Sequence, residues 1–245
     1  MSGKIITSFS RHEVKYLLTP EQYAALLPHL QQHLVMDQYG QHTISNIFYD
    51  TDCYEITRAS IEKPLYKEKL RVRAYGVPDP ETGSVFIELK KKYRHIVYKR
   101  RIMVTPPEAR AFLQGGISPA HADPQITAEI AHFMDLHHPE PKVFLSYDRI
   151  ALFGLEDPDL RVTFDTNLLW RDTDLSLCSG AYGSPVLPDD RVLMEIKVPG
   201  AMPLWLARTL SEQKLFGTSF SKIGACYTTF ILPQIFSKKV VTAHV

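Results

Sequence analysis

The chain has 245 residues, of which 44% are hydrophobic and 22% charged, and its formal net charge is only +1. These values are typical of a globular protein with a sizeable core, and we expect residues 1–245 to form a single domain. The near-neutral total excludes a protein that binds polyanions over its whole surface, so a basic site must arise from local segregation of charge.

The three cysteines, Cys53, Cys178 and Cys226, lie far apart and form no CxxC pair. Their odd number and wide spacing indicate neither a disulfide framework nor a zinc site. The first residues lack the apolar core of a signal peptide, and no apolar stretch approaches the roughly 20 residues needed to cross a bilayer. We therefore expect a cytoplasmic protein without a membrane segment.

The first helix is predicted to begin after Thr19, because proline follows it and Gln22 stands three residues further, as in a capped helix start. Apolar residues then recur at helical spacing up to Leu34, and Pro28 predicts a kink among them. Shorter helices are predicted over residues 52–61, 106–114, 124–137 and 203–216. The segment 222–232 is rich in apolar and β-branched residues, and the pattern leaves its state open.

Eight segments show the alternation or the β-rich composition of strands, bounded by Gly, Pro, Asp or Asn. They are 9–17, 43–50, 67–76, 84–93, 95–104, 142–153, 160–169 and 191–199. Since helices lie at the start, between strands and near the end, the predicted fold class is α+β with a dominant antiparallel sheet.

The alternation gathers cations on one side of these strands, because residues i, i+2 and i+4 share a face. In the run Lys69-Leu70-Arg71-Val72-Arg73, three cations lie on one face and two apolar residues on the other. Other strands repeat the separation. Their charged faces carry Arg11, Glu13 and Lys15; Glu88, Lys90 and Lys92; Lys99 and Arg101; Arg149; Arg161 and Asp165; and Glu195 and Lys197.

For a single strand, a charged face is ordinarily one that faces water. Many cations on neighbouring strands would repel each other, however, unless an anion of high charge density lay among them. Arginine and lysine both suit phosphate oxygens, so the pattern predicts a tunnel or an open concave sheet that binds a phosphate chain. The carboxylates on these faces either hold Mg²⁺ or Mn²⁺ or serve as partners of the cations.

Several other site types lack their motifs. The sequence has no GxxxxGK[ST], GxGxxG or GxSxG pattern, which argues against P-loop, Rossmann and α/β-hydrolase sites. His29 and His33 have helical i, i+4 spacing without HExxH, so we interpret them as surface or packing residues. Tyr75, Tyr93 and Tyr98 lie among cations, but the near-neutral charge and inward-facing cations argue against a nucleic-acid partner.

Nine segments carry a second signal. They are RHEVKYLL (11–18), SNIFYDT (45–51), KEKLRVRAYG (67–76), VFIELKKK (85–92), VYKRR (97–101), YDRIAL (147–152), LRVTFDT (160–166), VLMEIKVPGAMPLWL (192–206) and SFSKIG (219–224). In this order, and over nearly the whole chain, they resemble the polyphosphate polymerase domain of the vacuolar transporter chaperone (VTC) family in its stand-alone bacterial form. That family is a branch of the triphosphate tunnel metalloenzymes, as are the CYTH proteins.

The resemblance implies an eight-stranded antiparallel β-barrel tunnel with flanking helices, ATP as phosphoryl donor, polyphosphate as acceptor, and Mn²⁺ or Mg²⁺. The residues that it places on phosphates are Lys15, Arg71, Arg73, Lys90, Lys99, Arg149 and Lys222. Arg161 and Lys197 would support them, and Glu195 would bind the metal. The strand alternation adds Lys69, Lys92, Arg101 and Arg11 to the binding cations, and Glu13 and Glu88 to the candidate metal ligands.

Two positions qualify this assignment. Without the resemblance, Lys222 reads as a helix-start lysine after a capping Ser221. Many tunnel enzymes carry ExExK on the first strand, whereas Arg11 stands at the first of those glutamate positions in this chain. The difference favours a polymerase over a triphosphatase. We expect an ATP-dependent polyphosphate polymerase, with a tunnel triphosphatase or a non-catalytic polyphosphate or inositol-phosphate binding module as alternatives.

Overall fold

The computed structural model describes residues 8–9, 12–94, 96–187 and 191–242. In this part of the chain, eight strands of seven or more residues join in one antiparallel sheet, in the order β7-β6-β5-β4-β8-β9-β11-β2. They are β2 (His12–Leu18), β4 (His42–Asp50), β5 (Tyr66–Tyr75), β6 (Val85–Tyr93), β7 (Ile96–Val104), β8 (Glu140–Gly154), β9 (Arg161–Arg171) and β11 (Val192–Val198). Each predicted strand segment lies on one of them, which confirms the predicted strands.

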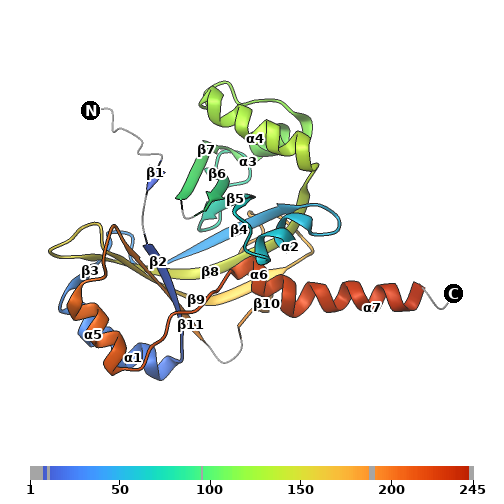
Figure 1. The fold of residues 1–245 in the computed structure, drawn as a ribbon. Coiled ribbons are helices and arrows are strands. Elements are labelled where there is room, and N and C mark those ends of the chain that lie inside the picture. Colours follow the sequence, from blue (N-terminus) through green and yellow to red (C-terminus); the bar gives the residue numbers. More distant parts are fainter. Residues whose placement is uncertain (1–7, 10–11, 95, 188–190, 243–245) are drawn as a thin grey trace.

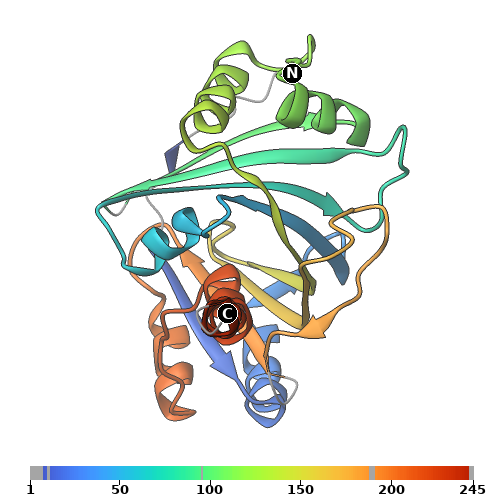
Figure 2. The same ribbon diagram turned by 90° about the vertical axis from the view of Figure 1, so that its right-hand side faces the viewer.

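The two ends of the sheet both pair with the N-terminal part of the chain. β1 (Ser8–Phe9) pairs with β7 at one end, and β2 pairs with β11 at the other. The sheet is curled, as expected for the tunnel fold (Figures 1 and 2). Among the described strands, however, the end strands β1 and β2 do not pair with each other, so the expected barrel is not closed. Two short strands, β3 (Leu34–Met36) and β10 (Ser184–Pro185), pair with β8 and β9.

The five predicted helices are present with small shifts at their ends. They are α1 (Pro20–Gln31), α2 (Glu55–Ile61), α3 (Pro106–Gly115), α4 (Pro124–His137) and α5 (Leu204–Glu212). A capping box of Thr19 and Gln22 starts α1, which continues as one helix through Pro28. The start of α2 falls at Glu55 because Asp50 accepts hydrogen bonds from two backbone N–H groups of its first turn.

The segment that the sequence left open is helical. α6 (Lys222–Cys226), the π-helical η1 (Tyr227–Ile231) and α7 (Leu232–Thr242) follow one another directly. Ile223, Cys226 and Tyr227 are buried at helical spacing, a pattern that the β-branched composition obscured. No helix in the described part of the chain is both long and apolar enough to span a bilayer.

Three buried apolar clusters hold these elements together. Leu70, Val72 and Leu89 pack beneath α3 and α4, and a second cluster lies between the sheet and helices α1 and α5 (Figure 1). Both occupy the outer face of the curl, as the strand alternation predicts. In the third cluster, Leu145 of β8 packs with α6 and η1 on the inner face (Figure 2). This helical segment therefore brings Lys222 to the charged faces of the strands.

Candidate functional site

The strand register places charged residues in rows on the inner face. Lys69 lies opposite Lys90, which lies opposite Lys99. In the neighbouring row, Glu88 lies between Arg71 of β5 and Arg101 of β7. We define the basic face as Lys15, Lys69, Arg71, Arg73, Lys90, Lys99, Arg149, Lys197 and Lys222, with Glu13, Glu88, Asp165 and Glu195 among them. Lys90 and Lys99 are accessible to water, yet burial by surrounding protein lowers the pKa of both, as expected on a concave surface.

Glu88 is the centre of one cluster on the basic face. Arg71 donates from Nε and Nη2 to Glu88 Oε2 at 2.9 and 2.7 Å, and Arg73 Nε lies 3.8 Å from the same oxygen. Lys99 Nζ lies 2.5 Å from Oε1, although without the alignment of a hydrogen bond. Burial alone would raise the pKa of this carboxyl, but the three cations outweigh burial and lower the pKa to about 2.

Asp165 of β9 is the centre of a second cluster. Arg149 of β8 donates two bonds to it, from Nε to Oδ1 at 2.6 Å and from Nη2 to Oδ2 at 2.7 Å. Lys222 of α6 donates to Oδ2 at 2.5 Å. Burial would raise the pKa of Asp165, yet Lys222 and Arg149 hold it below its ordinary value. The lysine that only the family resemblance selected thus lies within the basic face.

Tyr147 connects the two clusters. Arg73 Nη2 donates to its Oη at 3.1 Å, Lys222 Nζ lies 4.4 Å from its ring centroid, and Arg149 Cζ lies 5.1 Å from that centroid. Burial would raise the pKa of Tyr147, but the three cations lower it to about 8. Tyr147 and Asn46, whose Oδ1 accepts from Arg73 Nε, are not predicted from the pattern of charges because neither side chain is charged. The available signal was that Tyr147 shares a strand face with Arg149.

Glu195 and Glu13 form the third part of the basic face. Glu195 Oε1 lies 2.5 Å from Lys197 Nζ, and Lys15 Nζ lies 4.0 Å from Glu195 Oε2 and 3.1 Å from Glu13 Oε1. Burial would raise the pKa of Glu195, but Lys197, Lys15 and Arg149 lower it. Glu195 is 7% exposed, so its carboxylate points into the curl with little contact with bulk water.

These two carboxylates fit a divalent cation only in part. Within the described residues, no group of three or more His, Cys, Asp or Glu side chains could hold a metal ion. Mg²⁺ is commonly held by one or two carboxylates together with substrate phosphates and water, and Glu195 with Glu13 meets that requirement. Glu88 fits less well because three cations surround it.

The remaining predicted residues lie at the margins. Lys92 faces Lys67 in the row beyond Lys69. Arg101 is exposed over the ring of Phe86 at 5.1 Å, and Arg161 is exposed over the ring of Phe153 at 4.8 Å. Arg11 lies outside the described residues.

A separate cavity of about 680 Å³ lies away from these charges. Its walls include Phe112 of α3, Met134 of α4 and Tyr49 of β4, and no member of the basic face lines it. The candidate site is therefore defined by register, charge and ion pairing, and not by the position of this cavity.

Comparison with known proteins identifies the family and the fold. Among curated proteins, none matches the sequence. Two solved structures titled "putative adenylate cyclase" resemble the chain. The structure from Bacillus halodurans has a TM-score of 0.54 and 13% identity, and the match covers 88% of this chain and 96% of that chain. The structure from Vibrio parahaemolyticus has a TM-score of 0.46 and 14% identity, and the match covers 88% of this chain and 97% of that chain. The Mimivirus capping enzyme triphosphatase has a TM-score of 0.37 and 9% identity over 84% and 89%. The Bacillus structure supports the fold assignment. The family model described as the VTC domain matches residues 10–231, and the chain belongs to this family.

Proposed function

We propose that the chain is a metal-dependent phosphoryl transferase that binds a triphosphate or polyphosphate chain on the basic face and uses ATP to extend polyphosphate. The observation that carries the proposal is the convergence of Arg73, Arg149 and Lys222 on Tyr147. These cations come from β5, β8 and α6, and a second group of cations surrounds Glu88 beside them. Such a density of guanidinium and ammonium groups suits an anion that carries several charges along its length.

In this proposal, the cations divide into residues that the family resemblance assigns to the phosphates and residues that support them. The phosphate-holding residues are Lys15, Arg71, Arg73, Lys90, Lys99, Arg149 and Lys222. The supporting residues are Lys69, Lys92, Arg101, Arg161 and Lys197, together with Arg11. Glu88 and Asp165 keep the central arginines in fixed orientations before the phosphate chain arrives, so little side-chain ordering is left for the binding step.

Glu195 and Glu13 are the residues proposed to hold Mn²⁺ or Mg²⁺. Such an ion, when bound, would neutralise part of the charge on the phosphoryl group that is transferred. The protein itself contributes position and positive charge, which are the main requirements of phosphoryl transfer. The acceptor is a phosphate oxygen that is already ionised at neutral pH, so the reaction requires no general base. With water as acceptor, the same site would hydrolyse the triphosphate.

The assay for this function incubates the purified chain with ATP and Mn²⁺ and separates the products on a gel stained for polyphosphate. We expect long polyphosphate chains. Release of orthophosphate alone would instead identify a triphosphatase, and unchanged ATP despite tight binding would identify a binding module. Lys99→Met should lose product, because this partly exposed lysine holds phosphate, whereas Arg208→Met on the outer helix α5 should keep it.

Relative to the double variant Lys69→Arg/Tyr147→Phe, the affinity of the wild-type protein for inorganic triphosphate should fall by about tenfold or more as the pH rises from about 6 to about 9. Burial, reinforced by the neighbouring lysines, lowers the pKa of Lys69 to about 7, so this lysine loses its charge in the free protein over that range. Tyr147, with a pKa of about 8, gains a negative charge over the same range. Both changes weaken anion binding, whereas the inorganic triphosphate itself loses protons over this range, and comparison with the double variant at each pH removes that contribution.

Isothermal titration calorimetry in buffers of different ionisation enthalpy measures both the affinity and the uptake of protons. Lys69→Arg keeps its charge at every pH and should flatten the lower part of the profile, while Tyr147→Phe should flatten the upper part. A ratio of wild-type to double-variant affinity that does not change with pH would refute the assignment of these two groups to the binding site.

A further inference from the structure

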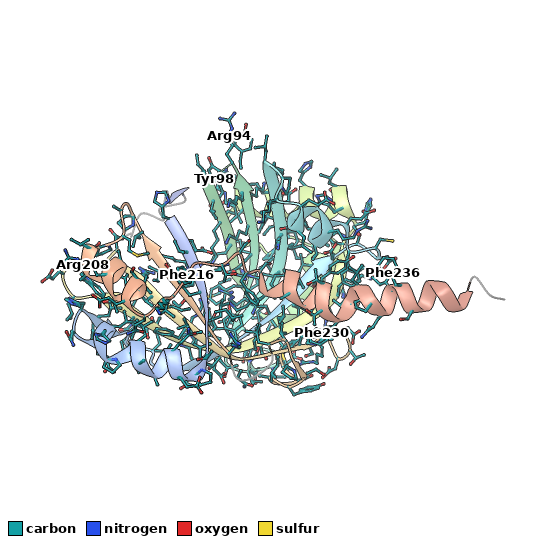
Figure 3. All side chains as sticks on the ribbon, turned by 60° about the horizontal axis from the view of Figure 1, so that its bottom comes forward. Arg94, Tyr98, Arg208, Phe216, Phe230 and Phe236 are labelled. Carbon is teal, nitrogen blue, oxygen red and sulfur yellow. The ribbon has the colours of Figure 1, made fainter. Side chains whose placement is uncertain are left out.

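Large apolar side chains are exposed together at one end of β5, β6 and β7. The most exposed is Leu65, at 72%, and the others are Tyr66, Tyr93 and Ile96, between 41% and 48%. Tyr66 lies opposite Tyr93, which lies opposite Ile96, and Arg94 N donates to Leu65 O at 2.6 Å. These contacts join residues 61–67 to residues 92–96, without His95, in a surface that we name the lip. Figure 3 shows Arg94 at the projecting end of these strands.

The lip also carries a concentration of positive charge. Lys63 and Arg94 are exposed on it, and Lys67 and Lys92 form the row of residues immediately behind. Arg94 Cζ lies 5.5 Å from the ring centroid of Tyr93. Glu62 is the single carboxylate in residues 61–67. Glu68, the next residue in the chain, is hydrogen-bonded to Tyr66 Oη and faces His137. Cations therefore outnumber carboxylates on this surface.

This combination distinguishes the lip from other exposed apolar residues. Leu204, Phe216 and Phe236 are 65%, 81% and 60% exposed, but isolated residues of this kind are normal on protein surfaces. A cluster of leucine, isoleucine and tyrosine bordered by lysine and arginine has the chemistry of the membrane interface: aromatic and aliphatic groups enter the headgroup region, and long cationic side chains reach the lipid phosphates. A second copy of this chain would instead bring like charges together across the contact.

We propose that the lip docks on the surface of a bilayer that contains anionic lipids. The contact is peripheral, and it is independent of the function proposed for the basic face. Because the row of Lys67 and Lys92 adjoins the row of Lys69, Lys90 and Lys99, docking orients one end of the basic face toward the lipid surface.

Co-sedimentation of the whole chain with lipid vesicles tests the proposal. The protein should bind vesicles of phosphatidylglycerol mixed with phosphatidylcholine, bind vesicles of phosphatidylcholine alone much more weakly, and be released by salt. The double variant Leu65→Ser/Ile96→Ser should bind the anionic vesicles about tenfold or more weakly. Lys63→Glu/Arg94→Glu should weaken binding by about fivefold or more for each cation removed.

Two comparisons make the test specific to the lip. The control variant Leu204→Ser/Phe216→Ser removes two exposed apolar residues elsewhere and should bind as the wild type does. Saturating inorganic triphosphate occupies the basic face, so binding through the lip should persist in its presence. The fold of each variant is checked by its thermal unfolding curve.

Three results would overturn the proposal. One is that neither vesicle binds the wild-type chain. Another is that triphosphate abolishes the binding of anionic vesicles while the lip variants still bind them. The lipid phosphates would then occupy the basic face and not the lip. The third is that the wild-type chain sediments as a dimer, and that Leu65→Ser/Ile96→Ser dissociates this dimer without changing vesicle binding. The lip would then contact a second copy of the chain.

Discussion

Replacing Glu88 by glutamine is expected to lower the free energy of unfolding of the ligand-free protein by about 3 kcal/mol and to tighten its binding of inorganic triphosphate by about tenfold. The glutamine keeps the size of the side chain but removes the charge that Arg71, Arg73 and Lys99 surround. The three cations then repel each other in a site that is 1% exposed at its centre. An added anion relieves this repulsion, so the loss of stability and the gain in affinity have the same cause.

The size of the stability change follows from the pKa of Glu88. A fall from 4.5 to about 2 corresponds to about 3 kcal/mol of preference for the ionised form in the folded state. Because the folded pKa lies below the unfolded one, this contribution is complete above about pH 4.5 and is lost as the pH falls toward 2. The effect of Glu88→Gln on stability should therefore diminish in acid.

Chemical unfolding with and without triphosphate, together with calorimetric titration, measures both effects. The control is Glu129→Gln, because Glu129 also joins two cations, Lys91 and Arg100, but on the outer face where its side chain is 22% exposed. That variant should lose less than about 1 kcal/mol and keep its affinity. Weaker triphosphate binding by Glu88→Gln would contradict the interpretation of Glu88 as a counter-ion and favour a role as metal ligand.

Strand alternation made the sheet predictable from the sequence. In the run from Lys69 to Arg73 the apolar and charged positions separate with period 2, and Leu70 and Val72 lie in the outer core as expected. The start of α1 was equally readable, because Thr19 and Gln22 carry the information for the cap locally. These features depend on residues that are near each other in the chain.

The features that the sequence did not reveal depend on residues that are distant in the chain. Lys222 reaches Asp165 across 57 positions, and Arg73 reaches Tyr147 across 74. Spacing along the chain carries no signal for such contacts. The lip was hidden for the same reason: Leu65 and Ile96 become neighbours only when β5, β6 and β7 pair. The helical segment after Lys222 was obscured because its β-branched composition masked its helical period.

The basic face combines two requirements that conflict in a ligand-free protein. Many cations are needed to hold a phosphate chain, yet their mutual repulsion opposes folding. Glu88 and Asp165 resolve the conflict by pairing with the arginines and lysines around them. If the pairing serves stability, removal of either carboxylate should be compensated by phosphate. A carboxylate that serves catalysis should behave differently, and Glu195 is the candidate for that second role.

Replacing Glu195 by glutamine is expected to lower the rate of phosphoryl transfer by about 100-fold or more, while triphosphate binding without metal remains at least as tight. Glutamine keeps the shape of the side chain but lacks the charge that a divalent cation requires from a ligand. Glu13, the carboxylate that shares Lys15 with Glu195, would be left to hold the ion. Lys15 and Lys197 lose a counter-ion in this variant, so their attraction for phosphate does not fall.

The ratio of triphosphate affinities with and without Mn²⁺ provides a measurement independent of turnover. In the wild type, Mn²⁺ should strengthen triphosphate binding, because Glu195 and Glu13 would hold the ion and its charge would attract the phosphates. Glu195→Gln should remove this gain in triphosphate affinity. Glu88→Gln, which replaces a buried carboxylate on the same face, should retain it. If Glu195→Gln keeps both the Mn²⁺ advantage and the normal rate, Glu195 is a counter-ion of Lys197 and Lys15, and the metal must bind elsewhere.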